Sequence, residues 1–456
     1  MKNKSVFILL LALLCPIFVL GQNISIIGKA NRPNALVRLI TYDEMLTCRQ
    51  TKVAETQSDN KGKFTLKAEI KEITPAQIAI NLDRVDIILS PNGKYDLEIL
   101  IPERNDDESY FEKPLPTIKI NSADDGGLYS QCVAAESLID DFVYENFNLI
   151  YRGGKIALLD TLENQVYRAL GEVKSDYVRN LIKYRIAAVE MAVNNESAVS
   201  KYYDNQPVLY SQTAYMDVFM ELFNGYFNTR HFNFYELRNA FYSDYDKFMT
   251  YLKKNDFLSR NPQLCEIIVM VELRRLYYEN KFDKNAILDY IGRIKNDSKY
   301  LKNKLVAQNL LAQMADLSYD SQAPSFSLKD RNGKVVKLSD YQDDMVLLQF
   351  VDRFSQVNEH EFLMLKDLQK QWNDTIQVVT IATKEVFEDY VQLFDKQGFK
   401  WRLLNLGDNI LLLEDYHVKT YPAYVILKRK NRVGMAPAPS PDHYLDFHVR
   451  RISKYL

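Results

Sequence analysis

The stretch that decides the fold of the C-terminal third spans residues 345–358 and reads MVLLQFVDRFSQVN. Its first part, Met345–Phe350, is a short, nearly continuous apolar run, which predicts a strand buried on both faces of a sheet. A helical pattern follows over Glu359–Trp372, then a second buried strand over Ile376–Ile381 and a helix over Lys384–Phe394. Alternating strands and helices of this kind favour an α/β sheet covered on both faces.

The residues on either side of this stretch extend the same pattern. An Asn-Gly turn at Asn332-Gly333 joins two short segments, Ala323–Asp330 and Val336–Tyr341, and predicts a β-hairpin at the start of the domain. A further strand is predicted over Tyr424–Leu427 and a closing helix over His443–Leu456. These elements together predict one complete α/β domain.

Three segments of this domain resemble thioredoxin-fold proteins of the TlpA/ResA-like group, which is related to alkyl hydroperoxide reductases. The segments are the entry hairpin with APSFSL at 323–328 and LSDY at 338–341, the strand VLLQF at 346–350, and YHVKTYPAY at 416–424. The resemblance covers residues 321–456 and implies a thioredoxin-like domain with a cis peptide bond at Tyr421-Pro422. It also implies a peptide groove at Phe354, Tyr421 and Pro422, where backbone groups hold an extended segment of a partner protein.

The chain departs from this group at the position where the group carries out its chemistry. The group has a C-x-x-C motif after the strand, whereas this chain has Ser355 in the place of the attacking cysteine and Asn358 in that of the resolving cysteine. Disulfide exchange proceeds through a thiolate and a mixed disulfide, which a serine hydroxyl cannot form. Glu359 and Glu361 would oppose a thiolate and complement a helix dipole, and Ser355 suits a helix N-cap. We predict no catalytic residue in this domain.

Residues 22–120 show the alternation that is typical of half-buried strands. Short alternating segments flank the turn Asp59–Gly62, and similar segments recur with turn signals between them. This pattern predicts an antiparallel β-sandwich. Gly28 and the hairpin over residues 58–64 also resemble the carboxypeptidase-regulatory-like modules of exported bacterial proteins.

Between these two units the spacing of apolar residues changes from the period of strands to that of helices. A charged, proline-containing stretch at 103–117 predicts a linker, and residues 121–320 carry apolar side chains at helical spacing. We predict an all-α domain there, and therefore a multidomain chain in three parts. This region also holds many tyrosines and phenylalanines, which form either an aromatic core or a stacking surface for a glycan or nutrient.

The N-terminus carries the features of an export signal. Two lysines precede an apolar stretch that Pro16 interrupts, and Gly21-Gln22 offers a small residue at a cleavage point. The signal peptide is predicted to span residues 1–21, which places the mature protein in the periplasm or otherwise outside the cytoplasm. Lipidation at Cys15 and an uncleaved anchor are the alternatives. No later stretch of the sequence predicts a transmembrane span.

Charge and cysteine content exclude several other classes of protein. Lys and Arg number 58 against 60 Asp and Glu, and the net charge of −2 favours no nucleic-acid partner. Three cysteines follow the signal, Cys48, Cys132 and Cys265, and none belongs to a C-x-x-C motif. They are expected to be buried free thiols, with one disulfide as the alternative. No Cys and His residues have the spacing of a zinc site, and no metal or other cofactor is predicted.

Three functions are compatible with these observations. The first is a non-catalytic protein of the cell envelope that binds a protein or peptide partner at Tyr421 and Pro422 through a redox-inactive thioredoxin-like domain. The second is a thiol–disulfide oxidoreductase of the TlpA/ResA type that uses Cys48, Cys132 or Cys265 from elsewhere in the chain. The third is a glycan- or nutrient-binding protein that uses the aromatic helical domain. The missing cysteine pair favours the first.

Overall fold

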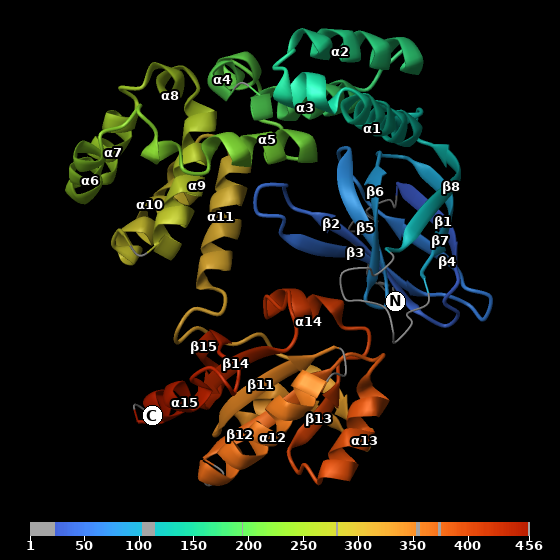
Figure 1. Cartoon of the computed structure of the whole chain (residues 1–456), viewed down its shortest axis with the longest axis vertical. Helices are drawn as coiled ribbons and strands as arrows, with labels where there is room; N and C mark the ends of the chain where they lie inside the picture. The colour runs from blue at the N-terminus through green and yellow to red at the C-terminus, as the bar shows by residue number, and fades with distance from the viewer. Residues whose placement is uncertain are drawn as a thin grey trace, which may run out of the picture.

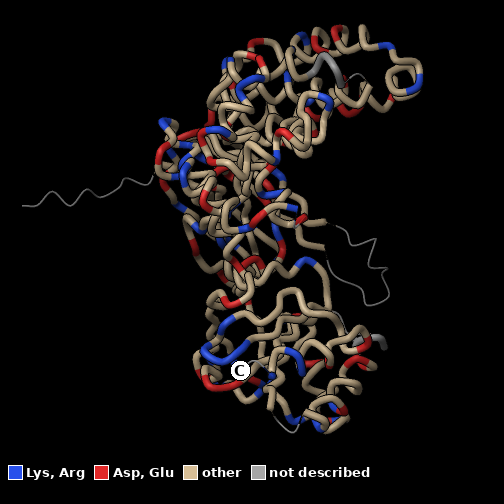
Figure 2. The backbone as a smooth tube through the Cα atoms, turned by 90° about the vertical axis from the view of Figure 1, so that its left-hand side faces the viewer, with Lys and Arg blue, Asp and Glu red and all other residues tan. Residues whose placement is uncertain are grey.

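The computed structural model describes residues 23–102, 115–193, 195–279, 281–352, 356–372 and 375–454, with the backbone alone for 195–198 and 356–358. Two β-sheets, a group of helices and a mixed α/β unit follow one another along the chain (Figure 1). The helices arch over the two sheets, and the α/β unit lies on the other side of them (Figure 1). Acidic and basic residues are interspersed over all three parts (Figure 2), as expected from the nearly neutral net charge.

Two four-stranded sheets form the N-terminal part, with the strand orders β4-β1-β7-β8 and β3-β2-β5-β6. The strands are β1 (Ile24–Ala30), β2 (Leu36–Tyr42), β3 (Gln50–Gln57), β4 (Lys63–Ala68), β5 (Thr74–Ile80), β6 (Asp83–Leu89), β7 (Lys94–Leu100) and β8 (Thr117–Asp124). Alternate side chains of both sheets, such as Ile26, Val37 and Leu97, are buried in one shared core. This is the arrangement that a period of two predicts for two packed sheets.

The prediction of an antiparallel sandwich is wrong at one pair of strands. β1 runs parallel to β7, with Ile26 opposite Tyr95, whereas the other paired strands of the two sheets are antiparallel. Parallel neighbours need a long connection between them, which the intervening strands β2–β6 supply here. The spacing of hydrophobic residues along a strand carries no information on the direction of its neighbour. The sequence therefore could not predict that β1 and β7 are parallel.

Between Leu128 and Ala315 the described residues form helices and their connections, and no strand. The helices are α1 (Leu128–Glu145), α2 (Ala157–Leu170), α3 (Asp176–Val193), α4 (Asn195–Tyr203), α5 (Thr213–Phe223), α6 (Phe234–Ser243), α7 (Tyr245–Leu252), α8 (Asp256–Arg260), α9 (Pro262–Glu279), α10 (Lys284–Asp297) and α11 (Leu301–Ala315), with a π-helical turn at Asn148–Arg152 and a 3-10 turn at Tyr226–Asn228. Leu46, from the loop between β2 and β3, is buried in the same core as these helices. Among the described helices of the whole chain, none is long and apolar enough to cross a membrane.

The aromatic residues of the helical part form mainly a core. The buried ones are Tyr177, Tyr184, Tyr202, Tyr203, Tyr210, Tyr215, Phe219, Phe223, Tyr226, Phe227, Phe241, Phe248, Phe257, Phe282 and Tyr290. The rings of Tyr203 and Phe223 meet edge-on with their centroids 5.3 Å apart, a favourable geometry for packed aromatic rings. A smaller set is exposed: Tyr144, Phe147, Phe234, Tyr235, Tyr242 and Tyr278. Most of the aromatic area therefore stabilises the fold, as the core alternative requires.

A seven-stranded sheet with the order β10-β9-β13-β12-β11-β14-β15 forms the C-terminal part. Its elements are β9 (Ser327–Asp330), β10 (Val335–Lys337), β11 (Met345–Val351), α12 (Gln356–Gln371), β12 (Ile376–Ala382), α13 (Phe387–Gln397), β13 (Arg402–Asn405), α14 (Ile410–Asp415), β14 (Ala423–Lys428), β15 (Arg432–Ala438) and α15 (Leu445–Ser453). Leu347 of β11 packs in one core with α12, α13 and α15, and its neighbour Leu348 packs in another core with α14. Both faces of the sheet are covered, as predicted.

The sequence did not predict three elements of this part, β13, α14 and β15. β13 has four residues and α14 has six, which is too short for a clear period. β15 contains Gly434 and Pro437, which argue against a strand in the interior of a sheet. β15 is the last strand of the sheet and pairs with β14, and only its first residues also contact the chain before β9, through an isolated bridge between Arg432 and Gln322. Proline is tolerated in such an edge strand.

Candidate functional site

The carboxyl ends of β11 and β12 meet the loop that enters β14. Asp352 follows β11, and Thr383 follows β12 and donates a hydrogen bond from Oγ1 to Oδ1 of Asp352 over 2.8 Å. The peptide bond between Tyr421 and Pro422 is cis, which confirms the prediction. Asp352, Thr383 and Tyr421 line a cavity of about 210 Å³, which we call the β14 cavity.

The predicted site residues are only partly covered by the described structure. Phe354 and Ser355 lie outside the described residues, and Asn358 is described by its backbone alone, in the first turn of α12. Tyr421 and Pro422 lie side by side before β14, and both are half-buried. The degenerate positions Ser355 and Asn358 therefore stay predictions.

The N-terminal sandwich reaches the β14 cavity with the tip of one hairpin. Leu82, in the tight turn between β5 and β6, packs in the same apolar cluster as Leu413 and Tyr421. Arg84, at the start of β6, donates from Nη2 to Oε1 of Glu414 over 3.0 Å. The cavity is thus walled by two parts of the chain that lie far apart in the sequence.

A chain of buried polar side chains runs under this site. Trp401 donates from Nε1 to Thr380 (3.0 Å), Thr380 from Oγ1 to Gln349 (2.9 Å), Gln349 from Nε2 to Tyr424 (3.0 Å), and the Tyr424 hydroxyl to Glu361 (2.7 Å). Gln349 and Thr380 are fully buried in the mainly apolar strands β11 and β12. Buried polar groups are almost always hydrogen-bonded, so a polar residue inside an apolar run is the sequence signal for such a network.

The position of Glu361 in the structure does not fit the role that the sequence predicted for it at the start of a helix. The sequence suggested a carboxylate that complements the helix dipole, but Glu361 lies in the second turn of α12, and its residue is 6% exposed. Burial raises the pKa of Glu361, and the nearby Asp442 raises it further. The hydrogen bond from Tyr424 and the proximity of His360 and His443 only partly oppose this rise in pKa.

We expect Glu361→Gln to change how stability depends on pH. A carboxyl with a raised native pKa binds more protons in the folded than in the unfolded chain, from its ordinary pKa of 4.5 up to its raised value. The free energy of unfolding of the wild type therefore falls as pH rises through that window, and the variant lacks this fall. Urea unfolding at a series of pH values measures it. Glu388→Gln, on exposed α13 surface, should follow the wild type; parallel curves for Glu361→Gln and wild type would contradict the assignment.

The three cysteines differ in environment, and none forms a disulfide. Cys132 and Cys265 are buried, and burial raises the pKa of each thiol to about 12. Cys48 is exposed, which corrects the expectation of a buried thiol, and its Sγ lies 3.2 Å from the carbonyl oxygen of Met45. Partial burial and the charge of Glu44 raise the pKa of Cys48 as well. None of these thiols has the lowered pKa of a reactive cysteine.

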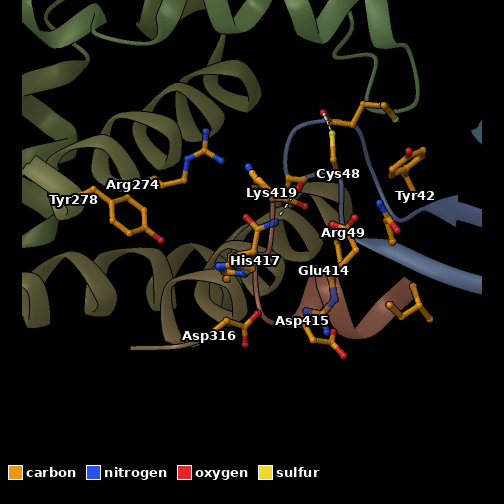
Figure 3. A pocket seen from close by; sticks show the side chains of 15 residues that line it. Tyr42, Cys48, Arg49, Arg274, Tyr278, Asp316, Glu414, Asp415, His417 and Lys419 are labelled. Atoms are coloured by element: carbon orange, nitrogen blue, oxygen red, sulfur yellow. Dashed lines mark hydrogen bonds between the residues drawn. The ribbon is translucent and has the colours of Figure 1, made fainter. Parts of the chain in front are cut away.

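A larger cavity, of about 730 Å³, lies where the three parts of the chain meet, and we call it the junction cavity. Its walls are the loop between β2 and β3, the helices α9 and α11, and the segment from α14 to Lys419 (Figure 3). Arg274 and Tyr278 enter from α9, and Cys48 faces them from the loop (Figure 3). Sequence reasoning missed this site because its residues come from three separate parts of the chain and form no local motif.

Comparison with known proteins finds matches to the C-terminal part of the chain. Residues 319–436 match the model of the AhpC/TSA family. Similar solved structures include the thioredoxin domain of a thiol-disulfide oxidoreductase from Bacteroides vulgatus (19% identity, 30% of this chain and 97% of that chain, TM-score 0.27), a thiol:disulfide interchange protein from a Bacteroides species (19%, 31% and 91%, 0.27) and an exposed lipoprotein thioredoxin from Streptococcus pneumoniae (21%, 28% and 99%, 0.24). No curated protein matches the chain. The family match and the sheet topology show a thioredoxin-like fold for this part, and fold alone does not define an activity.

Proposed function

We propose that this chain is a non-catalytic protein of the cell envelope whose thioredoxin-like domain binds an extended segment of a partner protein. The observation that carries the proposal is the β14 cavity beside Tyr421, which is present although residues 321–456 contain no cysteine. Asp352 and Thr383 give the cavity a polar side, and Leu413 gives it an apolar side. Recognition of an extended peptide depends on main-chain hydrogen bonds and side-chain pockets and needs no sulfur.

The alternative is an oxidoreductase of the TlpA/ResA type that uses a cysteine from another part of the chain. Attack on a disulfide requires a thiolate. The rate of attack therefore decreases when a smaller fraction of the thiol is ionised. The raised pKa values of Cys48, Cys132 and Cys265 leave little thiolate at neutral pH. This supports the binding function, in which Ser355 and Asn358 replace the redox pair. The buried aromatic core likewise supports it over a glycan-binding function.

The hairpin tip at Leu82 bears on how a partner would bind. Leu82 contributes to the apolar side of the β14 cavity, and the ion pair between Arg84 and Glu414 holds the hairpin against the domain. An incoming segment that reaches Tyr421 must contact or displace Leu82. The sandwich is therefore part of the proposed binding site.

We expect Tyr421→Ala to weaken binding of the full chain to cysteine-free peptide arrays by about tenfold, which corresponds to about 1.4 kcal/mol. Leu82→Ala should strengthen binding, because it removes the side chain that an incoming segment must displace. Tyr444→Ala is the matched control, since Tyr444 is 80% exposed and lies outside the cavity. Equal binding by Tyr421→Ala and Tyr444→Ala would contradict the proposed site.

Export and the finer family assignment belong to the same proposal. The predicted signal at residues 1–21 supports a periplasmic or otherwise exported protein, and a mature chain that begins at Gln22 is what this assignment requires. The TlpA/ResA-like motifs support the subgroup of the C-terminal domain, and Gly28 with the hairpin over 58–64 supports a carboxypeptidase-regulatory-like module. The proposed domains are 22–120, 121–320 and 321–456.

A further inference from the structure

The junction cavity has the size of a small-molecule site. Its volume of about 730 Å³ falls within the range of roughly 300–1,000 Å³ that ligand pockets occupy. It lies between parts of the chain, which is a preferred place for such pockets. Apart from Glu414, its lining residues differ from those of the β14 cavity, so the two are separate sites.

One side of the junction cavity carries positive charge that no ion pair within the described residues neutralises. Arg274 is half-buried, and its guanidinium forms no ion pair or hydrogen bond with any residue in the described ranges; the same holds for the side chain of Lys419. Arg49 lies on the other side of the cavity, beside Glu414 and Asp415 (Figure 3). Burial lowers the pKa of Arg274, which reflects the cost of holding its charge away from water. A guanidinium in this state favours a planar oxyanion that accepts two hydrogen bonds.

The buried acid that acts electrostatically on Arg274 already has a full set of hydrogen bonds. Glu44 interacts electrostatically with Arg274, but its oxygens accept hydrogen bonds from the backbone N–H groups of Leu46 (2.8 Å) and Thr47 (3.0 Å) and from Nδ2 of Asn309 (3.1 Å). The Thr47 hydroxyl also donates to Glu44. Glu44 therefore holds the lining residue Thr47 in place and leaves the donors of Arg274 available to a ligand.

The other side of the cavity carries two carboxyls. Figure 3 shows Asp316 and Asp415 across the cavity from Arg274. Burial raises the pKa of both carboxyls, and Asp316 and Glu414 raise that of Asp415 further. Arg49 and His417 offset only part of this rise. A ligand cation near these two carboxyls would relieve the remaining cost of their charge.

We propose that the junction cavity binds an amino acid or short peptide with free termini, its carboxylate on Arg274 and its ammonium group toward Asp316 and Asp415. The opposite polarity of the two sides matches a zwitterion. A dianion such as phosphate would meet repulsion from the two aspartates, and a neutral sugar would leave Arg274 without a counter-charge. An apolar ligand would bury these charges unpaired, which is costly.

The test uses the full chain and three pools of tripeptides randomised at every position: free termini, C-terminal amide, and N-acetyl. Two further probes complete the set: a mixture of free amino acids and, separately, inorganic phosphate. We expect free tripeptides or amino acids to bind at millimolar concentration or below in calorimetry, and amidation to weaken binding by about 30-fold. Arg274→Gln should abolish the preference for acid over amide. Asp316→Asn with Asp415→Asn should abolish the preference for free over acetylated N-termini.

Arg293→Gln is the matched control, because Arg293 is an exposed arginine of α10 paired with Asp289 and outside the cavity. It should keep both preferences. Arg274→Lys keeps the charge but loses the planar fork, so it should weaken binding less than Arg274→Gln and serves if the latter fails to fold. Equal binding of acid and amide by the wild type, an unchanged preference in the folded Arg274 variants, displacement by phosphate at equal concentration, or no binding of any pool would each overturn the proposal.

Discussion

Insulin reduction should appear only after two cysteines are introduced, in the variant Ser355→Cys with Asn358→Cys, and it should be weak. The substitutions place a C-x-x-C pair at the start of α12, on a thioredoxin-like domain that has no cysteine of its own. A helix N-terminus normally lowers the pKa of such a thiol. Here Glu359 lies in the first turn of α12 and is held by a 2.9 Å hydrogen bond from Gln397, so its negative charge opposes the thiolate.

A substitution that reverses the charge at Glu359 tests this explanation. Adding Glu359→Lys to the two cysteines should lower the pKa of the new thiol and raise the rate of insulin reduction by roughly tenfold, the effect of about one pKa unit on the ionised fraction. The same lysine in the chain without the cysteine pair should have no effect on the rate. A two-cysteine variant as fast as the variant with Glu359→Lys would contradict the role given to Glu359.

Replacing Glu272 with alanine should have the largest effect on stability. Glu272 is fully buried on α9, accepts hydrogen bonds from the backbone N–H groups of Gly225 (2.5 Å) and Phe227 (3.0 Å), and pairs with Arg275 at 2.9 Å. Its loss leaves the backbone N–H groups of Gly225 and Phe227 without an acceptor and removes one of the two carboxylate partners of the half-buried Arg275, which costs about 3–5 kcal/mol. Urea unfolding followed by circular dichroism measures the loss.

Glu279→Ala is the matched control for Glu272→Ala. Glu279 pairs with the same arginine, at 2.6 Å from Nη1, but its side chain is 32% exposed. Solvent screens such a pair, so the expected cost is below about 1 kcal/mol. Equal costs for the two variants would show that burial of the carboxylate is not what makes Glu272 important. Because α9 also carries Arg274, loss of Glu272 should weaken binding in the junction cavity too.

Much of the C-terminal fold could be predicted because its signals are local. The apolar runs of β11 and β12, the Asn-Gly turn before β10 and the motif around Pro422 each lie within a few residues. The parallel pairing of β1 with β7 could not be predicted, because it depends on contacts between segments that are distant in the sequence. β15 was missed because Gly434 weakens a strand pattern and Pro437 is tolerated in an edge strand, and edge position is a property of the assembled sheet.

The residues of the candidate sites also fall into two groups, those with a local sequence signal and those brought together only by the fold. Tyr421 and Pro422 belong to one motif, so the sequence alone could propose them as site residues. Glu361 was interpreted from its place near a helix start, and its burial against Tyr424 depends on how α12 packs on the sheet. The junction cavity was not predictable, because Arg274 and Asp415 come together only when the helical part and the thioredoxin-like domain are in place.

The most direct test of the central claim is the rate of insulin disulfide reduction by the wild-type chain, measured beside a variant with Cys48, Cys132 and Cys265 all replaced by alanine. The binding function predicts that both proteins show only the uncatalysed rate, because the thioredoxin-like domain supplies no thiolate and the three thiols have raised pKa values. Turnover by the wild type that disappears in the triple variant would contradict the claim and establish a cysteine delivered from another part of the chain.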